Sequence, residues 1–140
     1  MRIAVVPGLY FKSYARHTEA RIPFETLALC GALESVSGAA CRIVDFNLKG
    51  DGVTIGDGAA IFAGLPLDSQ FYQRAAQLLA AQQAPIALFN ISIHTNGNFF
   101  HAVKISQALR AVVPDVIIVF CGLGTVSRIM SGARSRGLRG

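Results

Sequence analysis

The stretch from Ile86 to Asn98 constrains the fold more than any other part of the chain. Residues 86–91 are mostly apolar, and polar residues follow them before a helical pattern begins. A short apolar run of this kind is typical of a parallel strand that is buried on both faces. Open α/β sheets bind ligands at the carboxyl ends of such strands, beside the exposed N–H groups of the next helix. We therefore expect any ligand site to be lined by Ser92, His94, Thr95 and Asn98.

Three further apolar segments alternate with helical patterns along the chain. These segments are predicted strands, and they lie at residues 2–6, 41–46 and 116–120. Helices are predicted at residues 22–37, 66–84 and 98–113, with a short helical segment at 126–130. Alternating strands and helices form parallel sheets with right-handed crossovers. The predicted fold is α/β, flavodoxin-like or Rossmann-like, with helices on both faces and strand order 2-1-3-4.

A flavodoxin-like sheet has a fifth strand, which the sequence after Arg128 does not supply. Residues 48–66 contain five glycines and are predicted to be a loop. The strand from Val116 to Phe120 would then be an uncharged edge, and such edges pair with other chains or aggregate. We expect a truncated domain at residues 1–130, followed by a flexible basic tail at residues 131–140. A partner chain or a second copy is expected to cover the edge.

Composition excludes several classes of protein. Charged residues make up 15% of the chain and hydrophobic residues 52%, which excludes a disordered chain. No apolar run approaches the ~20 residues that span a bilayer, and no signal peptide is recognised, so a cytoplasmic protein without a membrane segment is expected. The net charge is +5, but no basic face with interleaved aromatic residues is visible, so no nucleic-acid partner is expected.

The three cysteines are widely spaced and lie in apolar patterns. Cys30, Cys41 and Cys121 form no C-x-x-C motif, so neither a zinc site nor an iron–sulfur cluster is expected on this chain alone. We expect them to be small buried side chains.

Several segments, taken in order, resemble one known family. They are Val-Val-Pro-Gly at 5–8, Ile-Pro-Phe-Glu-Thr-Leu at 22–27, Val-Asp-Phe-Asn at 44–47, Ile-Ser-Ile-His-Thr-Asn-Gly-Asn at 91–98 and Cys-Gly-Leu-Gly-Thr at 121–125. Together they resemble the amino-terminal cobalamin-binding domain of cobalamin-dependent radical S-adenosylmethionine enzymes, many of which are methyltransferases. The resemblance extends from Arg2 to about Arg128.

The resemblance implies where cobalamin would bind. The corrin ring would lie over the carboxyl ends of the strands, and the nucleotide tail would enter beside the third and fourth strands. Glycines in the loops would let the bulky ring approach the backbone. The implied cofactor-binding residues are Pro7, Gly8, Ser92, His94, Thr95, Asn98, Gly122, Gly124 and Thr125.

The sequence also departs from the pattern of related cobalamin proteins. The Asp-x-His-x-x-Gly motif is absent, so no axial ligand to the metal is assigned, and Leu123-Gly124-Thr125 replaces the usual Pro-His. The radical domain with its three-cysteine loop is also absent. Two smaller questions stay open: His94 either contacts a ligand or caps the next helix, and Asp45 either faces a ligand or bonds its own turn.

The first functional hypothesis is therefore a cobalamin-binding module without a complete catalytic site. Its expected partner is a radical S-adenosylmethionine subunit or a second copy, bound through the edge Val116–Phe120. The alternative is a cofactor-free structural or interaction domain that docks a partner through the same edge. A small enzyme acting between the first and third strands is a third hypothesis, but the sequence shows no nucleophile–base set for it.

Overall fold

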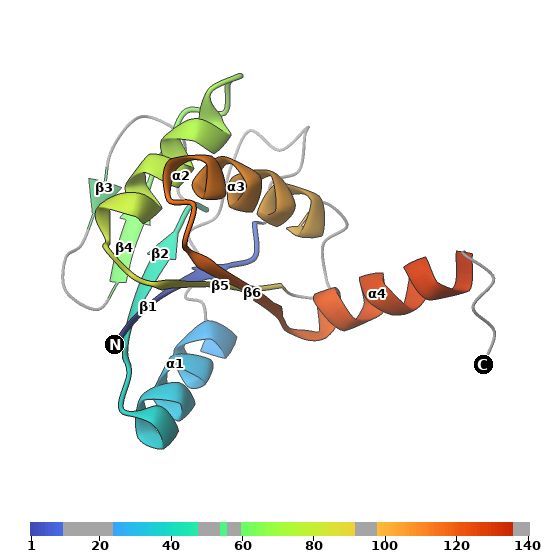
Figure 1. Ribbon diagram of the computed structural model, residues 1–140, viewed down its shortest axis with the longest axis horizontal. Coiled ribbons are helices and arrows are strands. Elements are labelled where there is room, and N and C mark those ends of the chain that lie inside the picture. Colours follow the sequence, from blue (N-terminus) through green and yellow to red (C-terminus); the bar gives the residue numbers. More distant parts are fainter. Residues whose placement is uncertain (10–23, 48–53, 56–59, 92–97, 136–140) are drawn as a thin grey trace.

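The computed structural model describes residues 1–9, 24–47, 54–55, 60–91 and 98–135. These residues form an α/β fold around one sheet (Figure 1). The elements in chain order are β1 (Arg2–Pro7), α1 (Phe24–Ser37), β2 (Ala40–Asp45), β3 (Thr54–Ile55), β4 (Ala60–Ala63), α2 (Phe71–Ala81), β5 (Ile86–Asn90), α3 (Asn98–Val112), β6 (Ile117–Cys121) and α4 (Leu123–Ser135).

The predicted fold class is confirmed. The sheet has six strands in the order β3-β4-β2-β1-β5-β6. The four predicted strands correspond to β1, β2, β5 and β6, and their order β2-β1-β5-β6 is the predicted 2-1-3-4. All pairings among these four strands are parallel.

The prediction of a missing fifth strand is wrong. Strand β4 lies within the segment that was predicted to be a glycine-rich loop, and it pairs in parallel with β2. The five parallel strands therefore have the Rossmann-like order 3-2-1-4-5, and the short β3 adds an antiparallel pair at the β4 edge. Only the four residues Ala60–Ala63 form β4, and the surrounding glycines obscure so short an apolar run.

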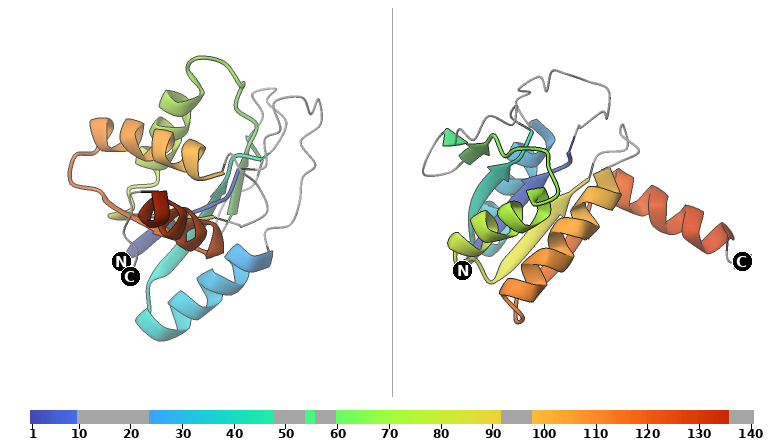
Figure 2. Two further views of the ribbon diagram at one scale, coloured as in Figure 1. Left: turned by 90° about the vertical axis from the view of Figure 1, so that its right-hand side faces the viewer. Right: turned by 90° about the horizontal axis from the view of Figure 1, so that it is seen from above.

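Alternate residues of the strands pack against helices on opposite faces of the sheet. Ala4 and Val6 of β1 belong to the larger core cluster, under α2 and α3, whereas Ile3 and Val5 belong to the smaller cluster beside α1. This alternation follows from the two-residue period of a strand. Figure 2 shows α1 on one side of the sheet and α2 with α3 on the other.

The smaller cluster contains two of the three cysteines. Cys30 of α1 and Cys41 of β2 are buried and free, as expected, whereas Cys121 is only partly buried. Burial, together with a smaller effect of the neighbouring Cys41, raises the pKa of the Cys30 thiol to about 12. At neutral pH the thiol is therefore protonated and behaves as an apolar group.

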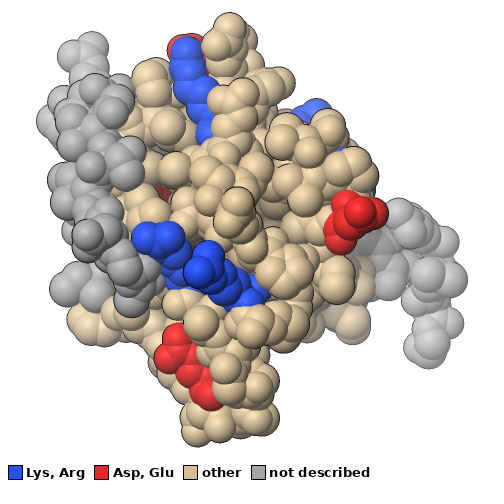
Figure 3. All heavy atoms as spheres, turned by 60° about the vertical axis from the view of Figure 1, so that its left-hand side comes forward, with Lys and Arg blue, Asp and Glu red and all other residues tan. Residues whose placement is uncertain are grey.

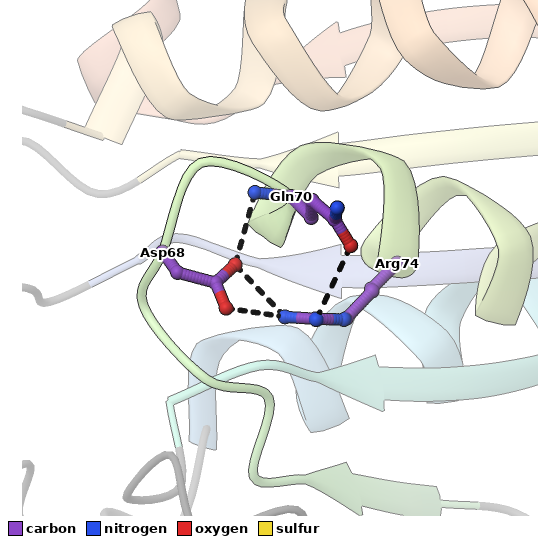
Figure 4. Close-up of polar contacts among 3 residues, drawn as sticks. All are labelled: Asp68, Gln70 and Arg74. Atoms are coloured by element: carbon purple, nitrogen blue, oxygen red, sulfur yellow. Dashed lines mark hydrogen bonds and ion pairs between the residues drawn. The ribbon is translucent and has the colours of Figure 1, made fainter.

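Helix α2 begins later than the predicted Pro66. The Asp68 carboxylate accepts a hydrogen bond from the Gln70 N–H at 2.9 Å, and Nη1 of Arg74 lies 2.8 Å from both carboxylate oxygens (Figure 4). The Asp68 carbonyl accepts from the Phe71 N–H at 3.1 Å, which forms a turn before the helix. The hydrogen bond from Arg74 holds the pKa of Asp68 below its usual range. These contacts explain a helix that begins at Phe71.

Helix α4 is longer than the predicted segment 126–130. It runs from Leu123 to Ser135, and it points away from the sheet in Figure 1 and in the right-hand view of Figure 2. Residues 131–135, the first half of the predicted tail, continue this helix, while residues 136–140 lie outside the described residues. More than half of each apolar side chain is exposed at Leu123, Val126, Ile129 and Met130.

Candidate functional site

The carboxyl ends of β2, β1, β5 and β6 form one edge of the sheet, which we call the carboxyl edge. Strands β1 and β5 are neighbours there, and Pro7 is in register with Asn90. From β1 the chain passes to β2 on one side and later to β5 on the other. The junction between β1 and β5 is therefore the topological switch point, where open α/β sheets bind ligands.

The nine predicted site residues fall into four groups. Pro7 and Gly8 are buried at the end of β1, while Gly122, Gly124 and Thr125 follow the end of β6. Asn98 is the first residue of α3. Ser92, His94 and Thr95 lie outside the described residues, so the two alternatives for His94 stay open.

Gly122 is needed by the packing of the chain itself. Its φ is +92°, and a Cβ atom there would lie 2.4 Å from the Ile91 carbonyl oxygen and 2.9 Å from Oδ1 of Asn90. The Gly124 N–H donates to the same Ile91 oxygen at 3.0 Å. The turn after β6 is thus held tightly against the end of β5, and this contact explains the glycine without any ligand.

The Thr125 hydroxyl is also engaged within the chain. It donates to the Cys121 carbonyl at 2.9 Å, and the residue is 6% exposed. This bond joins the first turn of α4 to the last residue of β6. Thr125 therefore has a structural role at the carboxyl edge.

A first polar cluster joins the ends of β1 and β2. The Asn47 backbone N–H and its Nδ2 both donate to Oδ1 of Asp45 at 2.9 Å, and Nδ2 also donates to the Gly8 carbonyl at 2.9 Å. Asp45 is 3% exposed and Asn47 is 5% exposed. The structure thus shows Asp45 bonding its own turn, the second of the two alternatives for this residue. The Asn47 amide also joins the predicted Gly8 to this buried carboxylate.

Burial raises the pKa of the Asp45 carboxyl, and the two hydrogen bonds from Asn47 oppose the shift. The folded chain therefore holds this proton more tightly than the unfolded chain does. The stability that the proton contributes is present below the ordinary aspartate value of about 3.9 and is lost as the pH rises through the higher folded pKa.

We expect Asp45→Asn to flatten the pH dependence of the free energy of unfolding in that window. The amide keeps an oxygen that can accept from Asn47 but has no carboxyl proton to lose. Urea unfolding at a series of pH values above about 3.9 measures this. The exposed Asp115→Asn is the matched control, and parallel curves for Asp45→Asn and the wild type would contradict the assignment.

A second polar cluster joins α1, β5 and β6. Nδ2 of Asn90 donates to Oγ1 of Thr26 at 3.1 Å, and the Cys121 thiol donates to Oδ1 of Asn90 at 3.6 Å. None of these three residues was predicted to be a site residue. The available signal was a polar residue, Asn90, inside an otherwise apolar strand.

The two faces of the sheet differ at the carboxyl edge. On the side of α3, the rings of Phe89 and Phe120 stack at 5.4 Å, and Phe99 lies 5.6 Å from Phe120. Packing around Pro7, Gly8 and Phe89 on that side leaves no room even for a water molecule. On the other side, Ile117 at the start of β6 is 56% exposed and Val119 in its middle is 37% exposed. Among the described residues, the exposed apolar side chains of the sheet therefore lie on the α1 side of β6, whereas Leu88 of β5 is buried there.

The described residues contain no group of three or more His, Cys, Asp or Glu side chains that could hold a metal ion. His101, on α3, bonds the Tyr72 hydroxyl at 2.9 Å, and burial lowers its pKa. None of the described helices is both long and apolar enough to cross a membrane.

Comparisons with protein-family models, curated proteins and solved structures return no match for this chain. The fold and the geometry of the carboxyl edge therefore carry the functional argument.

Proposed function

We propose that the chain is a cobalamin-binding module with no complete catalytic site of its own. The observation that carries the proposal is the exposed apolar surface on the α1 side of β6, the strand beside β5, where Ile117 and Val119 are exposed. The family resemblance implies that the nucleotide tail lies beside these two strands. An apolar strand face beside polar strand ends suits a ligand with an apolar heterocycle and a polar chain.

The described residues fit such a ligand in part. Polar groups gather at the carboxyl edge around Asp45, Asn47 and Asn90, and the tail would have room on the side of α1. Gly122 and Thr125 act within the chain, so they would shape the edge rather than bind the ring. Bound cobalamin would supply a cobalt ion that carries an alkyl group. This chain's residues would hold and orient it.

Desalting after incubation with hydroxocobalamin tests the proposal. We expect the purified chain to keep about one corrin per chain, seen by its visible absorbance. His94→Ala should weaken binding roughly tenfold, as expected for the loss of about 1.4 kcal/mol. His101→Ala is the matched control, because that histidine bonds the Tyr72 hydroxyl and is not among the predicted ligand contacts. A colourless, folded chain would overturn the proposal.

A second candidate function is supported by the exposed apolar residues themselves. Among the described residues, β6 pairs with β5 alone, so its other edge offers free N–H and C=O groups. Ile117 and Val119 of β6 are exposed together with an apolar stripe on α4, formed by Leu123, Val126, Ile129 and Met130. Exposed edges and apolar patches of this kind are typical of interaction surfaces. The candidate is a cofactor-free domain that docks a partner chain through β6.

The same column run separates the two candidates through the elution volume. A colourless chain that elutes as a dimer, and that Ile117→Lys converts to a monomer, would favour the docking domain. The lysine places a charge on the exposed side of the edge strand, which opposes pairing with another strand. A monomeric chain that retains the corrin would favour the cobalamin module.

A further inference from the structure

A second cavity lies at the opposite end of the sheet from the candidate site. It has a volume of about 340 Å³, and Arg2, Arg42 and Gln82 are among the residues that line it. The starts of β1 and β2 form its floor, and the carboxyl end of α2 covers it. We call this the amino-edge cavity. The amino terminus lies on the left-hand side of Figure 1, which comes forward in Figure 3. Basic side chains, drawn in blue, gather on this face.

Gln82 brings an unpaired oxygen to this cavity. The side chain is 7% exposed, and its Nε2 donates to the Leu78 carbonyl at 2.9 Å. That bond fixes the amide plane, and it leaves Oε1 buried with no hydrogen-bond partner. Buried polar atoms without partners are rare in proteins because each costs about 1–3 kcal/mol. The oxygen would be satisfied by a ligand that donates a hydrogen bond.

Arg42 brings an unpaired donor to the same cavity. Its Nε is buried and has no acceptor in the described part of the chain. Ala4 is in register with Arg42 on the neighbouring strand, so Arg42 projects to the α2 side of the sheet, where Gln82 caps α2. A ligand in the cavity would therefore meet a cationic donor and a neutral acceptor together.

Arg2 adds a second positive charge. It lies two residues before Ala4 on β1, so it projects to the same face as Arg42. Neither arginine forms an ion pair with a described acidic residue, and the nearby Glu34 carboxylate accepts from the Cys41 N–H at 3.0 Å. Two guanidinium groups outweigh the partial negative charge at the end of α2. The cavity therefore favours an oxyanion.

An apolar cavity of about 270 Å³ adjoins the charged one. Both are lined by Ala4 and Ala84, and the second is also lined by Leu79, Leu109 and Val116. A ligand with an anionic head and a small apolar group could fill both. Ligand sites commonly combine apolar walls with a few polar groups placed in this way.

We propose that the amino-edge cavity binds a small phosphate monoester. One phosphate group supplies oxygens for Arg2 and Arg42 and, when it keeps one proton, an O–H that donates to Oε1 of Gln82. The ester group occupies the adjoining apolar cavity. This site is separate from the carboxyl edge, so its test does not depend on cobalamin binding.

Calorimetric titration of the full chain with three probes tests the proposal. At pH 6 about half of a phosphate monoester keeps its second proton, whereas sulfate has no O–H to donate. We expect phenyl phosphate to bind more tightly than inorganic phosphate, and inorganic phosphate more tightly than sulfate. Amide shifts in an NMR titration should appear at the starts of β1 and β2.

Two variants separate the roles of the lining residues. Arg42→Met keeps an apolar stem and should weaken phosphate binding by at least about tenfold, the loss of one charge-assisted hydrogen bond. Gln82→Met should remove the preference for phosphate over sulfate. Arg74→Met is the matched control, because Arg74 pairs with Asp68 outside the cavity.

Two results would overturn the proposal. One is the absence of binding by all three probes, together with a loss of stability in Gln82→Met. That pair of results would mean that Arg42 donates directly to Gln82 in solution. The other is equal binding of phosphate and sulfate by the wild type. If Arg42→Met does not fold, the comparison of the three probes between the wild type and Gln82→Met still decides.

Discussion

Replacing Gly122 with alanine should destabilise the chain by about 3 kcal/mol or more, or prevent folding altogether. Two costs add at this position. The φ of +92° disfavours any side chain, and the new methyl group would lie 2.4 Å from the Ile91 carbonyl oxygen. That oxygen belongs to the backbone at the end of β5, so the clash can be relieved only by moving the turn after β6. Urea unfolding followed by circular dichroism measures the loss.

Two other glycines provide matched controls for Gly122→Ala. Gly38 also has a positive φ, +68°, but nothing lies within 4 Å of the added Cβ, so Gly38→Ala should cost only about 1 kcal/mol. Gly31 lies within α1 with open space around it, and Gly31→Ala should stabilise the helix by up to about 1 kcal/mol.

The outcome at Gly122 also bears on function. If Gly122→Ala folds with wild-type stability and only cobalamin retention falls, the glycine would serve the ligand and our structural assignment would be wrong. If stability falls as expected, loss of binding in this variant says nothing about ligand contact. Binding should therefore be tested with loop residues such as His94.

Replacing Phe89 with alanine should cost about 3–5 kcal/mol, the usual range for a buried phenylalanine. Phe89 is 1% exposed and lies in the middle of the larger core cluster. Its ring stacks on Phe120 at 5.4 Å, and through Phe120 it supports Phe99 of α3. The variant would leave a cavity between the sheet and α3 that the surrounding chain cannot fill completely. The free energy of unfolding from urea titration gives the loss.

Phe100→Ala is the matched control for this prediction. Phe100 follows Phe99 on α3 but is 57% exposed, and its ring contacts His101 and lies 5.6 Å from Nζ of Lys104. Its removal should change the free energy of unfolding by less than about 1 kcal/mol. Equal losses in the two variants would mean that the ring stack on β5 is not part of the core in solution.

These tests bear on one functional question. The carboxyl edge of this chain is organised by internal contacts at Gly122, Thr125 and Asn47. Exposed apolar surface lies on the α1 side of β6 and along α4, which follows the carboxyl end of β6. Either a bound cobalamin or a partner chain would bury part of that surface, and the elution and absorbance experiment distinguishes them.

Local pattern was sufficient to predict most of the sheet. Short apolar runs at the positions of β1, β2, β5 and β6, separated by helical patterns, predict parallel strands because only two-sided burial favours continuous apolar residues. Their order was predicted from the flavodoxin-like fold, because right-handed crossovers alone allow more than one order. The prediction failed at β4, because four residues between glycines carry too little periodicity to be recognised. The pairing of β4 with β2 is a long-range contact.

The candidate site was predicted less completely than the fold. Pro7, Gly8, Gly122, Gly124 and Thr125 do lie at the carboxyl edge, because residues that follow parallel strands meet at one edge. Their contacts could not be predicted: Asn47 reaches Gly8, and Asn90 reaches Thr26, across 39 and 64 residues of sequence. Hydrogen bonds between distant residues leave no local pattern to read.

The amino-acid sequence by itself determined the class of fold and the edge at which loop residues gather, since these follow from periodicity, polarity and the handedness of crossovers. Only the tertiary structure decided the position of β4, the direction of α4, the reason for Gly122 and the unpaired atoms of Arg42 and Gln82. Each of these depends on contacts between residues that are distant in the sequence. Those contacts decide which groups are buried and which polar atoms are hydrogen-bonded.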